Sequence, residues 1–109
     1  MRRLVLLAAV LAAVVAPASA DAFVWHLSYY KAKAWTVQSE RRICNKDSEC
    51  VAYGASCQRI TESRVDCLGG TIDETEYGEL QCTEMYHWGV NQWGRVKLRT
   101  GKSHCGYVE

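Results

Sequence analysis

Aromatic and cationic side chains alternate near the C-terminus, in a pattern that suits recognition of an anion. Every second residue from Trp93 to Arg99 is aromatic or cationic, and alternate side chains of a β-strand project from one face. An aromatic ring beside three cations is a suitable surface for a phosphate, a sulfated glycan or an acidic protein patch. A preceding strand would add two further aromatic residues. The predicted binding residues are therefore Tyr86, Trp88, Trp93, Arg95, Lys97 and Arg99.

The same segment is open to structural explanations. Positive charges on an edge strand discourage sheets from pairing edge to edge. The Trp88-Gly89 and Trp93-Gly94 pairs also have two interpretations. An exposed indole ring matches the apolar face of a sugar, whereas a buried indole supplies core to a small domain. The sequence leaves both interpretations open.

Three histidines offer a different chemistry. His26, His87 or His104 could form a general acid–base pair with Glu79 or Glu84, as in small secreted ribonucleases. Such an enzyme needs two groups that converge on one phosphate, with a cation beside them. No local spacing joins these residues, so hydrolysis of RNA is the alternative hypothesis and no catalytic residue is assigned.

A third hypothesis comes from the segment Gln58–Asp66. It lies between Cys57 and Cys67 and contains Arg59 and Arg64, either of which could enter a trypsin-like pocket. Protease inhibitors commonly present a rigid loop between cystines. A nine-residue interval between cysteines also arises for structural reasons alone.

Neither a metal nor a cofactor is expected. The acidic stretch from Asp73 to Glu79 lacks the alternating carboxylates and the final glutamate of a calcium loop. The cysteines lack the close pairs of a zinc site, because the intervals between them hold 5, 6, 9, 14 and 22 residues.

The predicted binding face depends on a β-hairpin. Polar and apolar residues alternate from Leu80 to Val90 and again from Trp93 to Arg99, on either side of Asn91 and Gln92. In the second strand we expect Val96 and Leu98 to face inward and the cations to face outward.

The remaining segments predict a mostly β domain. Phe23–Tyr30 alternates as a strand, and Ala32–Val37 would continue it or form another. Asp47–Ile60 is predicted as a short helix, and Leu68–Thr71, which contains two glycines, as a turn. The predicted fold is a small disulfide-rich domain with an antiparallel sheet and at least one hairpin, or an α+β variant of it with one short helix.

The cysteines predict disulfides. An even number of cysteines in a small exported domain indicates a disulfide framework, and six allow about 15 pairings, which the sequence leaves open. Each bridge typically adds about 2–4 kcal/mol to a domain too small for a large core. The six residues are Cys44, Cys50, Cys57, Cys67, Cys82 and Cys105.

The N-terminus has the three parts of a secretory signal. Two arginines precede an apolar run from Leu4 to Ala16, which is too short for a spanning helix of about 20 residues. Ala18 and Ala20 fit a small-x-small cleavage site, so residues 1–20 are predicted to be removed. The mature chain, 21–109, is expected to be a single soluble domain and a monomer.

The net charge of the predicted mature chain argues against a generic nucleic-acid or membrane binder. The predicted mature chain holds eleven basic and twelve acidic residues, a net charge of −1, which does not favour generic binding to nucleic acids or membranes. These observations together predict a secreted, effector-like or toxin-like binding protein, extracellular or, in a bacterium, periplasmic. Its expected partner is a protein or a glycan.

Overall fold

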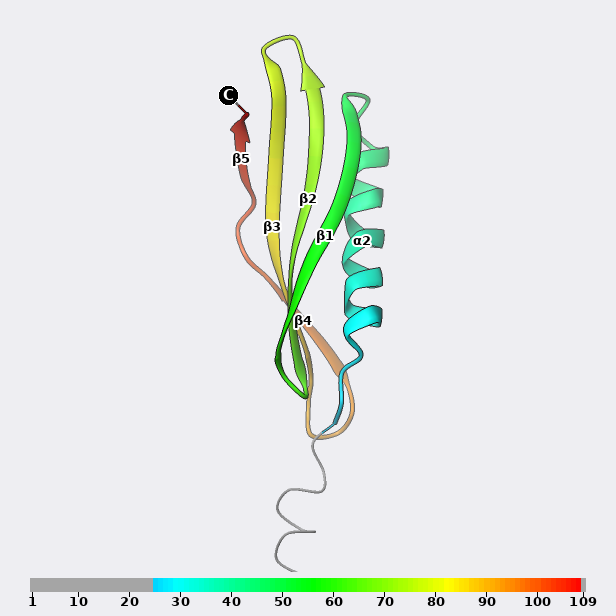
Figure 1. Ribbon diagram of the computed structural model, residues 1–109. Helices are drawn as coiled ribbons and strands as arrows, with labels where there is room; N and C mark the ends of the chain where they lie inside the picture. The colour runs from blue at the N-terminus through cyan, green and yellow to red at the C-terminus, as the bar shows by residue number, and fades with distance from the viewer. Residues whose placement is uncertain (1–24, 109) are drawn as a thin grey trace, which may run out of the picture.

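The computed structural model describes residues 25–108, which form one helix and a five-stranded antiparallel sheet (Figure 1). This architecture confirms the predicted fold class of a small disulfide-rich, mostly β domain with one helix. The predicted signal segment, residues 1–20, lies outside the described residues. Within residues 25–108, no helix has the length and apolar character needed to cross a membrane.

The helix, α2, spans Tyr29–Asn45, and the sequence predicted strands for its first half, up to Val37. Residues 25–28 precede it without regular structure, so the strand prediction for Phe23–Tyr30 is wrong over its described part and that for Ala32–Val37 is wrong. Ser28 caps the helix, because its side chain accepts a hydrogen bond from the backbone N–H of Lys31 at 3.2 Å. The buried stripe consists of Ala32, Thr36, Glu40 and Cys44.

Three long strands form a meander. They are β1 (Cys50–Thr61), β2 (Arg64–Thr75) and β3 (Gly78–Val90), joined by two-residue turns. The helix predicted over Asp47–Ile60 is wrong because β1 pairs with β2 along most of that segment. The turn predicted at Leu68–Thr71 is also wrong, since these residues lie in the middle of β2 between β1 and β3.

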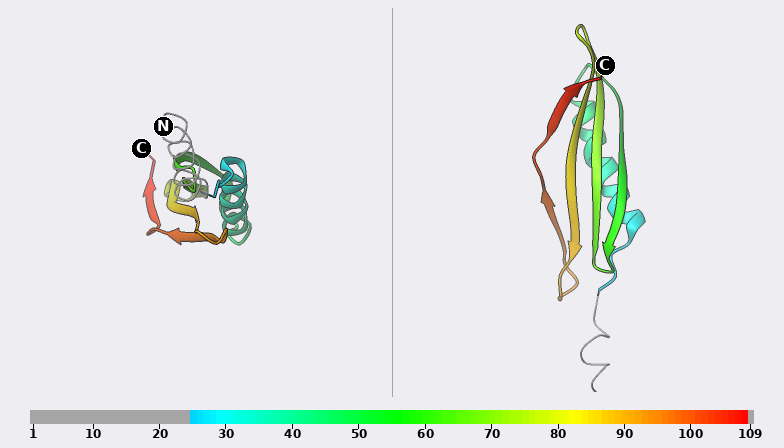
Figure 2. Two further views of the ribbon diagram at one scale, coloured as in Figure 1. Left: turned by 90° about the horizontal axis from the view of Figure 1, so that it is seen from below. Right: turned by 60° about the vertical axis from the view of Figure 1, so that its left-hand side comes forward.

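The predicted C-terminal hairpin is confirmed. Strand β3 pairs with β4 (Val96–Thr100), and its first half pairs with β5 (His104–Tyr107). The sheet order is β1-β2-β3-β4, so β4 is an edge strand, as is β1 at the other end. The end-on view shows β4 curling back toward α2, whereas β5 lies on the side of β3 away from α2 (Figure 2).

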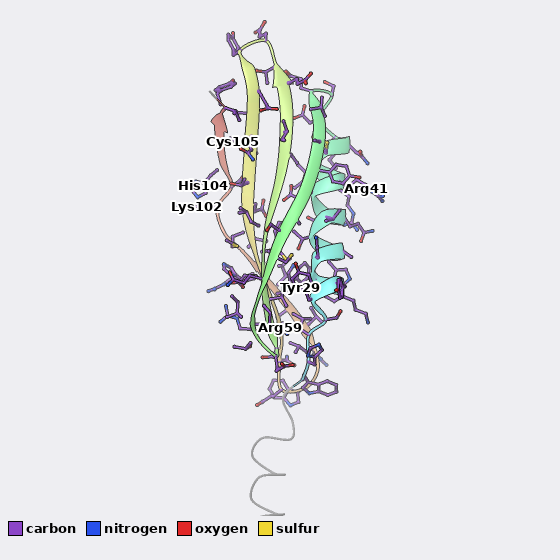
Figure 3. All side chains as sticks on the ribbon, viewed as in Figure 1. Tyr29, Arg41, Arg59, Lys102, His104 and Cys105 are labelled. Atoms are coloured by element: carbon purple, nitrogen blue, oxygen red, sulfur yellow. A yellow bond between two sulfur atoms is a disulfide. The ribbon has the colours of Figure 1, made fainter. Side chains whose placement is uncertain are left out.

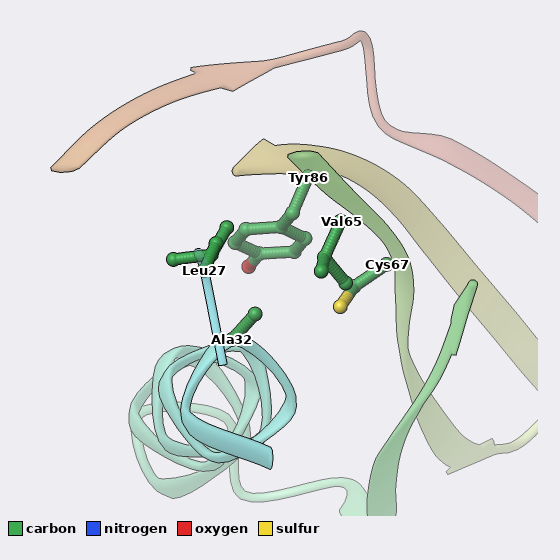
Figure 4. Packing of buried hydrophobic residues seen from close by; sticks show 5 residues of the cluster. All are labelled: Leu27, Ala32, Val65, Cys67 and Tyr86. Carbon is green, nitrogen blue, oxygen red and sulfur yellow. The ribbon is translucent and has the colours of Figure 1, made fainter. Parts of the chain in front are cut away.

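The core lies between α2 and one face of the sheet. The ring of Tyr86 from β3 lies between Leu27 and Ala32 on one side and Val65 and Cys67 of β2 on the other (Figure 4). Residues directly opposite each other in an antiparallel pair share a face, which is why Cys67 and its partner Tyr86 both point toward the helix. Among residues 25–108, no helix covers the opposite face of the sheet.

All six cysteines pair, as the sequence predicted. The bridge Cys57–Cys67 joins residues in register on β1 and β2, and Cys82–Cys105 does the same for β3 and β5. Cys44–Cys50 ties the end of α2 to the start of β1. Each bridge therefore links two elements that are already neighbours.

Candidate functional site: two surfaces on strand β4

Strand β4 carries different chemistry on its two faces. Lys97 lies opposite Gly89 and Arg99 lies opposite His87, whereas Leu98 lies opposite Trp88. Because opposite residues share a face, the two cations lie on the sheet face away from α2. Leu98 and Val96 lie on the face toward α2. The expected alternation along this strand is therefore present.

A cation of β4 and a cation of β2 lie on either side of a glycine in β3. Arg64 of β2 lies opposite Gly89 of β3, and Gly89 lies opposite Lys97 of β4. Adjacent strands are about 4.8 Å apart, so Arg64 and Lys97 flank a position with no side chain. The resulting pocket has a volume of about 240 Å³. We call the surface formed by Arg64, His87, Lys97 and Arg99 the basic face.

The basic face keeps a positive charge. Asp66 Oδ1 lies 3.0 Å from His87 Nδ1 and 3.8 Å from Arg64 Nη2, so this carboxylate neutralises one cation. Lys97 and Arg99 form no ion pair with any other residue of the segment 25–108. Three cations against one carboxylate leave a net positive surface, with no side chain at the glycine position between two of them.

Two predicted binding residues lie on the opposite face. Tyr86 is only 2 % exposed and belongs to the core, so it is unavailable to a partner on the basic face. Trp88 shares the orientation of Tyr86, and its Nε1 donates to Thr36 Oγ1 at 2.8 Å. The expected widening of the cationic surface by these aromatics is wrong, because even-numbered residues of β3 point toward the helix there.

Trp93 and Arg95 lie in the loop between β3 and β4 and not in the strand. The side chain of Asn91 accepts hydrogen bonds from both of their backbone N–H groups, each at 2.9 Å. Gly94 has a φ of +79° and lies against the indole of Trp25, where an added Cβ would come within 3.0 Å. Trp93 itself is 72 % exposed. The predicted row of four residues is thus reduced to Lys97 and Arg99.

A second concave surface lies between α2 and β4, where the sequence predicted no site. Its volume is about 390 Å³. The helix supplies one wall and β3 and β4 supply the floor and the other wall. We call this surface the aromatic groove; its residues are Trp35, Gln38, Ser39, Arg42, Tyr86, Trp88, Val96 and Leu98. The helical spacing of the first four was the available signal, but Trp35 was predicted to lie in a strand and no element was predicted for the other three.

The three histidines lie in separate places. His26 Nδ1 lies 2.6 Å from Glu62 Oε2 at the β1–β2 turn, and His87 belongs to the basic face. The hydrogen bond and charge of His26 hold the pKa of Glu62 below its usual range. His104 lies on β5 beside Cys105, away from the end of the molecule that carries Arg59 (Figure 3).

The segment Gln58–Asp66 is a β-hairpin end and not a free loop. It consists of the end of β1, the turn at residues 62–63 and the start of β2. Arg59 donates through Nη1 to the carbonyls of Thr61 at 2.9 Å and Glu62 at 3.0 Å, and through Nη2 to that of Leu27. These bonds fasten the segment before α2 to the hairpin, so this guanidinium has a structural role.

Comparison with known proteins returns no matching family model, no matching curated protein and no matching solved structure.

Proposed function

We propose that this protein is a secreted binding protein that acts through surface contacts, and that its basic face receives an anionic group of the partner. The observation that carries the proposal is the row Arg64–Gly89–Lys97 across three paired strands. A carboxylate, sulfate or phosphate could approach the backbone at the glycine and meet a cation on each side. The strands fix the backbone positions of both residues, which sets the spacing at which their side chains leave the sheet.

Export fits the same architecture. Three disulfides in a domain of this size are typical of oxidising compartments and resist unfolding outside the cell. The paired strands hold the cations at fixed spacing, which favours recognition over nonspecific attraction.

The test is binding of two anionic probes, a heparin-derived tetrasaccharide and a glutamate-rich peptide, to the oxidised protein. We expect at least one probe to bind with an affinity that falls as salt is raised. The double variant Lys97→Glu/Arg99→Glu should weaken that binding by about tenfold or more.

The matched control is Lys31→Glu/Lys33→Glu, which reverses two exposed charges on the helix. It changes net charge by the same amount but leaves the basic face intact, so binding should persist. If both double variants bind as the original protein does, or lose binding equally, the basic face is not the contact surface.

Cleavage of RNA remains a second candidate because of the pairing of His87 with Asp66. The carboxylate contacts Nδ1, which leaves Nε2 free to transfer a proton beside Lys97 and Arg99. RNA should then be cut by the purified protein, and His87→Ala should abolish cutting while His104→Ala should not. Lack of cleavage would exclude this candidate.

A further inference from the structure

Strand β4 has an open outer edge. One side of the strand pairs with β3, and its other side pairs with no strand among residues 25–108. All five residues of β4 are exposed. An edge strand presents backbone N–H and C=O groups that another extended chain can use.

The apolar side of β4 opens onto a preformed groove. Val96 and Leu98 are 44 % and 45 % exposed and form one wall of the aromatic groove. The volume of about 390 Å³ is enough for one or two large apolar side chains. Arg42 lies at the helix side of the groove and forms no ion pair within the described residues.

Hydrogen bonds hold the aromatic floor in place. Trp88 is bonded to Thr36, and the Tyr86 hydroxyl lies 3.0 Å from both Ser39 Oγ and Glu40 Oε1. The rings of Trp35 and Trp88 have centroids 5.1 Å apart. The floor is therefore shaped before any partner arrives, which lowers the entropic cost of binding.

The charges of β4 select among possible partners. A second β4 strand would place like charges beside Lys97 and Arg99, which is unfavourable in a sheet. An acidic strand would place opposite charges there and gain from each pair. The other edge strand, β1, lacks this pattern, since its outward positions near the middle are Gly54, Ser56 and Gln58.

We infer that β4 accepts an extended segment of an acidic partner protein as an added strand, in which apolar and acidic residues alternate. The acidic side chains lie beside Lys97 and Arg99, and the apolar side chains lie beside Val96 and Leu98 at the mouth of the aromatic groove. The charged half of this inference rests on the proposed function of the basic face. The apolar groove and the open edge are independent observations.

The test uses an eight-residue peptide of alternating leucine and glutamate, with calorimetry on the oxidised full chain. A control peptide has the same composition, with four leucines followed by four glutamates. We expect the alternating peptide to bind at least about tenfold more tightly than the control peptide. Val96→Ser, a neutral change in the groove, should weaken the alternating peptide severalfold and leave binding of the heparin tetrasaccharide unchanged, because Val96 does not line the pocket of the basic face.

Backbone pairing is tested with two N-methylated forms of the alternating peptide, methylated either at the leucines or at the glutamates. Alternate N–H groups of a strand point to the same edge, so one form turns its methyl groups toward β4 and the other turns them away. Strand addition predicts that one form loses binding and the other keeps it.

Equal binding by both methylated forms, equal binding by the control peptide, or no effect of Val96→Ser would each overturn strand addition. The proposed function is judged separately, by Lys97→Glu/Arg99→Glu on the tetrasaccharide and the glutamate-rich peptide. If those probes depend on the two cations while the alternating peptide fails, the basic face stands and the added strand does not.

Discussion

At the scale of single residues, two glycines on opposite faces of the sheet have different roles. Gly69 faces α2, where a Cβ would overlap Glu40 Oε1 and come within 2.8 Å of Tyr86 Cε1. Both of these side chains are held by their mutual hydrogen bond at 3.0 Å. Gly54 faces away from the helix and has nothing within 4 Å of such a Cβ.

We therefore predict opposite effects of the two alanine substitutions on the free energy of unfolding, measured with urea. Gly69→Ala should destabilise by about 1–3 kcal/mol, because the core must shift to make room. Gly54→Ala should stabilise by about 0.5–1 kcal/mol, since glycine weakens a strand. Equal effects at the two positions would show that Gly69 does not set the approach of the helix.

Glu40 is a buried acid whose charge opposes folding. Glu40 is 3 % exposed. Burial raises the pKa of its carboxyl, the hydrogen bond from Tyr86 partly offsets this, and the charge of Glu84 raises the pKa further. The same burial contributes to raising the pKa of Tyr86 to about 12, which keeps its hydroxyl protonated as a donor. The folded chain thus holds the proton of Glu40 more tightly than the unfolded chain does.

The consequence is a loss of stability as pH rises. Below the unfolded pKa, about 4.3, Glu40 is protonated in both states and carries no penalty, and the penalty grows as pH rises through the raised folded pKa. Glu40→Gln keeps an acceptor for Tyr86 without the charge. It should raise Tm at pH 7 more than at pH 4, whereas Glu76→Gln in the exposed β2–β3 turn should leave the profile unchanged. A lower Tm for Glu40→Gln at pH 7 would contradict this account.

At the scale of elements, the sequence predicted the β3–β4 hairpin and missed the helix for a definable reason. The hairpin segments alternate between polar and apolar residues along most of their length, with a polar break at Asn91 and Gln92. The buried stripe of α2 includes Thr36 and Glu40, which find hydrogen-bond partners on β3. No apolar periodicity marks such a stripe, and the aromatic residues before it imitate a strand.

The misplaced turn at Leu68–Thr71 has a similar cause. Two adjacent glycines usually indicate a chain reversal. Here Gly69 makes room for Glu40 and Tyr86, while Gly70 lies against the backbone, with its Cβ position 3.3 Å from the carbonyl oxygen of Cys82. Both glycines are therefore explained by close approach in the folded sheet, which a single sequence does not reveal.

The disulfides should contribute unequally to the free energy of unfolding because they close loops of different lengths. Cys82–Cys105 spans 23 positions, compared with 6 for Cys44–Cys50. Restriction of the unfolded chain increases with loop length. Cys82→Ser/Cys105→Ser should cost about 3 kcal/mol, and Cys44→Ser/Cys50→Ser about 2 kcal/mol.

The longer bridge also holds β5, whose four residues are all exposed. Its removal should accelerate amide hydrogen exchange at Gly106 and Tyr107 while the β1–β2 pairs stay protected. Unchanged protection of β5 in that variant would mean that strand pairing alone keeps it on the sheet.

At the scale of the whole molecule, the candidate site combines residues that lie far apart in the sequence and belong to different predicted segments. Lys97 and Arg99 were predicted, because their alternation is local. Arg64 had been assigned to an inhibitor loop and His87 to a possible catalytic pair. Only the register of β2, β3 and β4 places these residues around Gly89. This register depends on pairing between residues far apart in the sequence, which local patterns do not reveal.

The aromatic groove depends in the same way on a tertiary arrangement. Its helix wall includes Trp35 and Arg42, and its other wall is β4. The helix packs mainly over β1 and β2, so the curl of β4 back toward it leaves the groove between them (Figure 2). The groove therefore exists only where both walls come together in the folded chain.

The contact surface can be mapped from the backbone amide chemical shifts of the oxidised protein during titration with the glutamate-rich peptide. We predict that the largest changes fall on His87, Gly89, Lys97 and Arg99, with Arg64 affected from the neighbouring strand. Changes confined to the exposed face of α2 around Lys33, or to β5 around His104, would contradict the assignment of the basic face as the contact surface.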